Sequence, residues 1–139
     1  MIDFIYNSLA AIGFTHPLHP SLTHIPMGMV MGAFFFQAAS FKWEDLAKSA
    51  HYCLLLALIF WPPTAVLGLL DWQHRYLGVL NGLIIAKIVL ACVLLVFLLG
   101  TIFLYRRGNI DKKILMFAYL LNLLTVVAMG FIGGQLIFG

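Results

Sequence analysis

The stretch LIIAKIVLACVLLVFLLGTIFL, residues 83–104, decides the fold of this chain. It contains one charged side chain, Lys87, and is otherwise almost entirely apolar. A helix needs roughly 20 consecutive apolar residues to cross the hydrocarbon core of a bilayer. A run of this length and composition therefore predicts a membrane-spanning helix.

Three further stretches have the same character, at about residues 22–41, 50–70 and 114–137. Over the whole chain 63% of residues are apolar and 9% are charged, with a mean hydropathy of +1.04. Soluble domains carry roughly 25% charged residues, so this composition excludes that class. The net charge of +3 is too small and too localised for nucleic-acid binding. We expect an integral membrane protein without a nucleic-acid partner.

The links between the apolar stretches are short, namely FKWEDLAKS, DWQHRYLGVLNG and YRRGNIDKK. Short links force neighbouring helices to run antiparallel. The predicted fold is all-α, a single domain over 1–139 that forms an up-down four-helix bundle, with helices at about 20–41, 48–71, 81–105 and 112–138. Pro62 and Pro63 lie inside the second of these helices and predict a kink there.

Lysine and arginine counts in the short links predict the orientation of the bundle. The first and third links together hold Lys42, Lys48, Arg106, Arg107, Lys112 and Lys113. The opposite side holds Arg75 alone. The first and third links are therefore expected in the cytoplasm and both termini on the outer, periplasmic side. The N-terminal stretch MIDFIYNSLAAIGF lacks the pattern of a signal peptide, and we expect it to stay in the mature protein.

This topology brings polar residues from four segments to the outer end of the bundle. The first segment contributes His16, His19 and His24, the second Asp71, His74 and Arg75, the third Asn81 and Lys87, and the fourth Gln135. Polar residues at the opposite end are mostly ordinary loop charges. The outer end is therefore the predicted functional site.

His24, Gly28 and Gly32 are spaced by four residues and share one face of the first long helix. One interpretation is a groove beneath the imidazole that admits a flat cofactor, with His24 as its axial ligand. The other is close contact between helices, which small residues at this spacing commonly provide in membranes. The sequence does not decide between them.

Asp71 and His74 are three residues apart and neighbours on one helical face. A carboxylate beside a histidine orients the ring and raises its basicity, as it does around metal ligands. The alternative is an ordinary interaction at the end of a helix. We interpret Lys87 as snorkelling to the membrane surface and His51, at the other end of the bundle, as structural. Cys53 and Cys92 are interpreted as small buried apolar residues.

The stretch HPLHPSLTHIPMG at residues 16–28, with GLLDW at 68–72 and the closing glycines, resembles the domain-of-unknown-function 2231 family of bacterial membrane proteins. The resemblance covers nearly the whole chain and implies four helices in the bacterial inner membrane. It implies the following signature positions: His16, His19, His24, Pro26, Gly28, Asp71, Gly133 and Gly134. The family pattern also has a histidine near the start of the third helix, where this chain has Asn81.

Our first functional hypothesis is an electron-transfer subunit that binds haem b near the outer face. His24 and His74 are the predicted axial ligands, because they come from adjacent antiparallel helices and are expected at one depth. His19 and His16 are substitutes, Gly28 and Gly32 line the groove, and Asp71 supports the ligands. Expected partners are the lipid bilayer, other membrane redox subunits or a periplasmic cytochrome, and quinone. Such a chain would not be an enzyme by itself but part of an oxidoreductase complex.

Two alternatives remain open from the residues alone. The histidines, with Asp71 or His74, suit copper, zinc or iron without haem, and the sequence does not choose among these metals. A third hypothesis has no cofactor, and the proline-bracketed histidine segment then serves as a rigid cap in a structural or assembly subunit.

The predicted orientation can be tested with reporter fusions. Alkaline phosphatase fused after Gly139 should be active, because it folds only on the outer side of the inner membrane. A fluorescent protein that matures only in the cytoplasm, fused at the same residue, is the matched control and should stay dark. If the phosphatase fusion is inactive and the fluorescent fusion is bright, the C-terminus and the histidine segment lie on the cytoplasmic side, and the predicted orientation is wrong.

Overall fold

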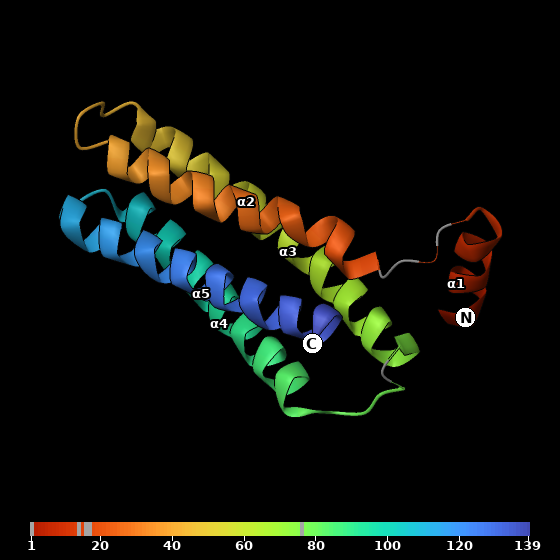
Figure 1. Cartoon of the computed structure of the whole chain (residues 1–139). Coiled ribbons are helices and arrows are strands. Elements are labelled where there is room, and N and C mark those ends of the chain that lie inside the picture. The colour runs from red at the N-terminus through yellow and green to blue at the C-terminus, as the bar shows by residue number, and fades with distance from the viewer. Residues whose placement is uncertain (1, 14, 16–17, 76) are drawn as a thin grey trace.

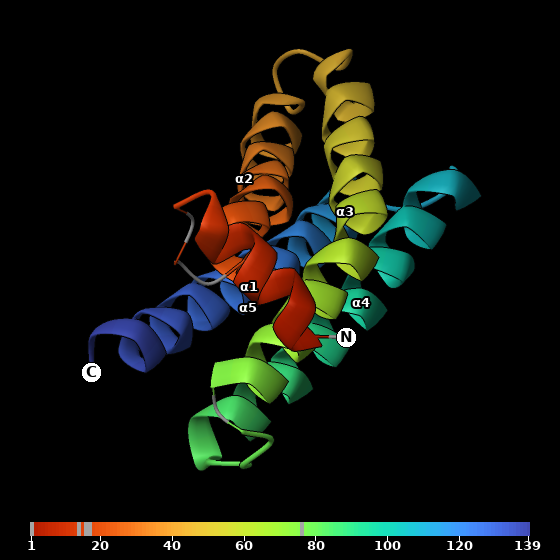
Figure 2. The same cartoon turned by 90° about the vertical axis from the view of Figure 1, so that its right-hand side faces the viewer.

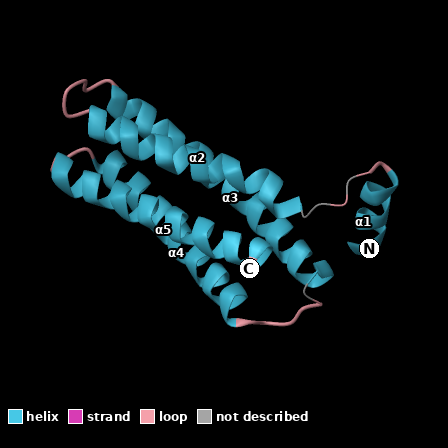
Figure 3. Ribbon diagram, in the orientation of Figure 1, coloured by secondary structure: helices cyan, strands magenta, loops and turns pink. Residues whose placement is uncertain are grey.

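A computed structural model of the chain describes residues 2–13, 15, 18–75 and 77–139, with side chains for 3–13, 15, 22–75, 77–136 and 139. Within these ranges the chain forms helices and loops but no strand (Figure 3). The helices are α1 (Ile2–Ala11), α2 (Leu18–Ala39), α3 (Leu46–Arg75), α4 (Gly82–Arg107) and α5 (Lys112–Phe138). The predicted all-α class is confirmed.

Helices α2 to α5 are long and apolar enough to cross a membrane. Helix α2 packs on α3 and α5, and α4 packs on the same two helices, so the four form a closed ring. Figure 1 shows the α2–α3 and α4–α5 loops together at one end, which we call the inner end. The α3–α4 connection and the start of α2 lie toward the opposite, outer end. This arrangement matches the predicted up-down connectivity.

Helix α1 was not expected, since the first predicted helix began at about residue 20. It is a ten-residue helix that contacts the bundle only at α3, within the described residues (Figure 2). Its side chains are largely exposed, with Phe4 75% accessible. A segment this short is below the length that spans a bilayer, so hydropathy alone did not distinguish it from a loop.

Helix ends are set by local capping. The Asn81 side chain accepts a hydrogen bond of 2.9 Å from the Ile84 N–H at the start of α4. Asp111 accepts one of 3.0 Å from the Lys113 N–H at the start of α5. Gly108 ends α4 with φ +70°, a left-handed conformation that glycine adopts without strain. Asn81 thus has a structural role, although the sequence analysis counted it among the outer polar residues.

Helix α3 continues through Pro62 and Pro63 and ends at Arg75, four residues beyond the predicted boundary near residue 71. Its axis changes direction along its length, as Figures 1 and 2 show. The Thr64 hydroxyl donates 2.7 Å to the Phe60 carbonyl beside the prolines. The Trp61 indole donates 3.1 Å to the Ala91 carbonyl of α4 and joins the two helices.

Gly130 of α5 lies in contact with α2. A Cβ atom at this position would lie 2.9 Å from Met27 Cε. A Cβ atom added to Gly100, on the exposed side of α4, would have no other atom within 4 Å. The end of the Met27 side chain therefore fills the space that a side chain at position 130 would occupy.

Replacing Gly130 by Leu should lower the free energy of unfolding by about 1–3 kcal/mol, because the added carbons overpack the α2–α5 contact. Gly100→Leu is the matched control and should leave it nearly unchanged. Unfolding of the detergent-solubilised protein, followed by circular dichroism, measures both. Equal effects of the two substitutions would contradict close packing at Gly130.

Candidate functional site

Asp71 is the central residue of a polar cluster at the outer end of the bundle. It lies one turn before the end of α3 and is 6% exposed. Its Oδ1 accepts a hydrogen bond from the Tyr6 hydroxyl of α1. An ionisable side chain shielded from solvent in a membrane protein is a candidate functional residue. The sequence analysis found Asp71 but missed Tyr6, because residue 6 lay in a segment it treated as a tail.

Lys87 of α4 belongs to the same cluster. It is half-buried, and its Nζ lies 3.5 Å from the position a Cβ of Gly133 would occupy. The Asp71 carboxylate interacts electrostatically with the Lys87 ammonium. Gly133 of α5 thus leaves room for the ammonium group between helices. The Lys87 amine therefore lies beside Gly133 of α5, and the interpretation of Lys87 as a snorkelling residue stays a prediction.

His74 lies one turn beyond Asp71 on α3. Its ring stacks on the Tyr6 ring, with centroids 3.8 Å apart and 6° between the planes. Its Nδ1 is 3.5 Å from Oδ1 of Asp3 in α1. Asp3 therefore places a carboxylate beside His74, a role for which the sequence analysis predicted Asp71 alone. The signal that could have revealed Asp3 and Tyr6 is their spacing of three, which puts both on one face of a helix.

The protonation of Tyr6 follows from this environment. Burial raises the pKa of the Tyr6 phenol, and the hydrogen bond to Asp71 raises that pKa further. The phenol therefore stays protonated and keeps donating to the carboxylate at neutral pH. The Tyr6 side chain of α1 therefore contacts both Asp71 and His74 in the last turns of α3.

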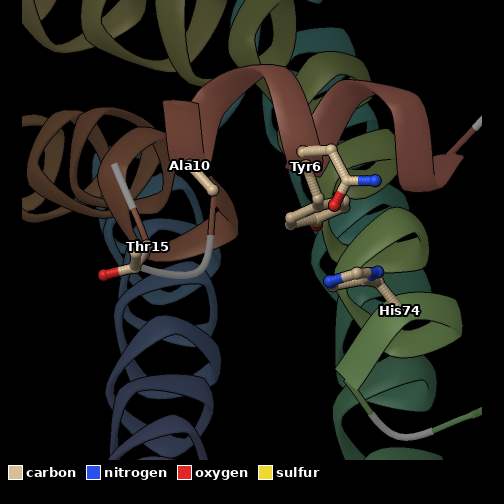
Figure 4. A pocket seen from close by; sticks show the side chains of 5 residues that line it. Tyr6, Ala10, Thr15 and His74 are labelled. Carbon is tan, nitrogen blue, oxygen red and sulfur yellow. The ribbon is translucent and has the colours of Figure 1, made fainter. Parts of the chain in front are cut away.

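A pocket opens between α1 and the end of α3, as Figure 4 shows. It has a volume of about 210 Å³, and its lining consists of Tyr6, Asn7, Ala10, Thr15 and His74. The Arg75 guanidinium donates 3.1 Å to the Thr15 carbonyl at its rim. Typical small-molecule sites measure roughly 300–1,000 Å³. This pocket therefore suits a small polar ligand and is too small for a haem macrocycle.

The structure separates His24 from His74. A Cβ on Gly32 of α2 would lie 3.9 Å from Cys53 Sγ of the antiparallel α3, which sets the register of the pair. His24 precedes Gly32 by eight residues, so it is level with the residue eight after Cys53, namely 61. His74 is thirteen residues (74 minus 61) further along, a rise of about 20 Å. By this register the two histidines lie at different depths along the bundle, which differs from the expectation that they share one depth.

His24 also faces away from the bundle interior. The core-facing side of α2 carries Pro26, Val30, Ala33 and Gln37, and His24 is exposed on the opposite side. Gly28, one turn further, is exposed as well, with nothing within 4 Å of a Cβ added there. Helix contact through Gly28 is therefore absent from the described part of the chain, and the surface beside His24 is open.

The remaining predicted residues lie apart from the cluster or cannot be placed. His16 is outside the described residues, and His19 lies in the first turn of α2 with a side chain that is not described. Gln135 is exposed on α5. Among the described residues there is no group of three His, Cys, Asp or Glu side chains suited to a metal ion. The cofactor and site predictions stay open on this point.

Tyr6→Phe tests whether the bond to Asp71 holds α1 on the bundle. The variant keeps the aromatic ring on His74 and removes the hydroxyl, which at a charged acceptor is worth about 1.5–3 kcal/mol. Amide hydrogen exchange of α1 should become faster. Ser8→Ala removes a hydroxyl that bonds only within α1, to the Phe4 carbonyl, and should leave exchange unchanged. Unchanged exchange in Tyr6→Phe would refute the role.

The raised pKa of Tyr6 has a matching prediction. A group whose pKa is higher in the folded than in the unfolded protein stabilises the fold at pH values below its unfolded pKa. This stabilisation is lost as the pH rises through the pKa of the folded state. Near pH 10, the usual tyrosine pKa, Tyr6 should therefore remain protonated. Tyrosinate absorbance at about pH 10 should be the same in the wild type and in Tyr6→Phe, and the two should diverge only at higher pH.

A family model described as "Predicted membrane protein (DUF2231)" covers residues 15–139. No curated protein and no solved structure matches the chain significantly. The matched region contains all four long helices, whereas Asp3 and Tyr6 of α1 precede it. The chain belongs to this family of multi-helix membrane proteins, whose function is unknown.

Proposed function

We propose that this chain is an electron-transfer subunit of a larger quinone-linked membrane complex. In this proposal haem b binds to the side of α2 that faces away from the bundle interior. His24 is the axial ligand contributed by this chain, and the second ligand comes from a partner subunit. The exposed surface of His24 and Gly28 carries this proposal.

The argument begins with the environment of His24. It lies in the first turn of the candidate span Leu22–Ala39, on a side of α2 that no other described helix covers. A polar ring that faces lipid without a partner is costly, so such residues usually face protein, water or a ligand. The open space at Gly28 accepts a flat group that a side chain would exclude. Histidine is a normal axial ligand of electron-transfer haem.

Ligation across a subunit boundary follows from the depth of the histidines. His74 is about 20 Å further along α3 than the level of His24, by the rise per residue of a helix. The second axial ligand lies on the opposite side of a haem from the first, so we propose that another chain supplies it rather than His19 of the same helix. This revises the ligand pair of the sequence hypothesis and keeps its cofactor.

The outer cluster supports a link to quinone chemistry. Oxidation of a quinol releases two protons with its two electrons, so a quinol site needs groups that accept protons. Asp71 and His74, joined through Tyr6, provide a carboxylate and an imidazole at the end of the bundle that is predicted to face outward. We propose that they receive these protons in the assembled complex.

One observation favours a second candidate, a non-haem metal site at His74. Metal-ligating histidines usually give their other ring nitrogen to a carboxylate. The Asp3 carboxylate lies 3.5 Å from His74 Nδ1, so Nε2 is the ring nitrogen that would bind a metal. Copper, zinc or iron would fit this donor, with further ligands from a partner or from His16 and His19.

The deciding experiment is a reduced-minus-oxidised optical spectrum of the complex purified from native membranes. A haem b α-band that disappears in His24→Ala and persists in His74→Ala supports the proposal. A spectrum without haem bands, with stoichiometric metal that is lost in His74→Ala, favours the second candidate. A complex without haem or metal, which still assembles around this chain, would overturn both and assign an assembly role.

A further inference from the structure

A second group of polar residues lies inside the bundle near its inner end. We call it the inner polar layer and define it by Gln37 of α2, His51 of α3, Thr101 of α4, and Tyr119 and Asn122 of α5. All five are buried, from 0% exposure for Asn122 to 8% for His51. Each of the four spanning helices contributes to it. The outer cluster and the proposed function use none of these residues.

Contacts between the helices place these residues at similar depths along the bundle. Met27 meets Gly130, so Gln37, ten residues after Met27, is level with residue 120 of the antiparallel α5, next to Tyr119. The Gly32–Cys53 contact puts Gln37 level with residue 48 of α3, about 5 Å from His51 by helix rise. Asn122 bonds directly to Thr101. The layer therefore crosses the whole bundle within about one helical turn.

Some polar groups of the layer bond to each other. Asn122 Nδ2 donates to Thr101 Oγ1 at 2.8 Å and to the Ala118 carbonyl at 2.9 Å. The Thr101 hydroxyl donates 2.7 Å to the Phe97 carbonyl. The His51 ring stacks on Tyr105, with centroids 4.2 Å apart. These contacts hold the side chains in place with their remaining polar atoms inside the bundle.

Four buried atoms of the layer have no hydrogen-bond partner among the described residues. They are Gln37 Oε1, His51 Nδ1, Tyr119 Oη and Asn122 Oδ1. Two are amide oxygens that only accept, the phenol both donates and accepts, and a neutral imidazole nitrogen does one or the other. Buried groups of this kind are rarely left unbonded, because removal from water without a new bond is unfavourable.

We propose that the inner polar layer is a binding site for internal water. Water is the small neutral ligand that both donates and accepts, and buried waters typically bond to about three polar groups that lack other partners. Gln37 lies two residues before the end of α2, about 3 Å by helix rise, so exchange with the inner aqueous phase requires a short path. Hydration makes His51 and Tyr119 accessible to protons from that side.

The sign of a stability change tests the proposal. Tyr119→Phe and Gln37→Met remove polar atoms while nearly keeping volume. If water bonds to these atoms, each variant should lower the thermal midpoint by several degrees, because the water loses a partner. If the atoms are dry and unbonded, the midpoint should stay or rise, since an unsatisfied group is removed. Tyr52→Phe, on the exposed side of α3, is the matched control.

Radiolytic hydroxyl-radical labelling of the wild-type protein tests the proposal without a variant. Radicals form from water next to a side chain, so Tyr119 should be labelled although it is 1% exposed. Leu54 and Leu98, which are apolar and 0% exposed, are the dry references and should stay unlabelled. Absence of label on Tyr119 overturns the proposal, whatever the variants do. Stoichiometric quinone extracted from a preparation in which Tyr119 is unlabelled would identify the occupant instead.

Discussion

The structure depends on the requirement that a chain in a bilayer must satisfy its own backbone hydrogen bonds. Four of the helices are long enough to do so across the hydrocarbon core, and their ends carry caps such as Asn81 and Asp111. Even the Pro62–Pro63 pair lies in a continuous helix. The same requirement applies to side chains, so polar groups gather at the two ends or face the interior, where Trp61 and Asn122 find partners on a neighbouring helix.

The two polar regions differ in chemistry. The outer cluster contains charges that compensate each other, with Asp71 between the Tyr6 hydroxyl and the Lys87 ammonium. The inner polar layer contains uncharged polar side chains, and four of their atoms have no hydrogen-bond partner among the described residues. Compensated charges hold helix ends together, whereas unsatisfied neutral groups favour a small exchangeable ligand. We expect Asp71 and His74 of the outer cluster to hold α1 in place through Tyr6, and the inner polar layer to bind water.

The functional proposal rests on what lies outside the bundle. His24 and Gly28 are on the side of α2 opposite its core-facing residues, so the interior of a single chain is not where a cofactor on His24 would lie. The pocket beside His74 is too small for haem. Under the proposed function, a partner subunit would cover this side of α2 and supply the second ligand. The same side of α2 would then contact both the partner subunit and the cofactor.

The sequence by itself determined the membrane class, the four long helices, their antiparallel order and the gathering of Asp71, His74 and Lys87 toward the outer end, because hydropathy and short links constrain these directly. Only the tertiary structure decided which residues meet. Depth depends on where α3 ends and on the register set by contacts such as Gly32 with Cys53, and neither is encoded in a periodicity. The partnership of Tyr6 with Asp71, across 65 residues, required the docking of α1, which has too few apolar residues to be recognised as a bundle element.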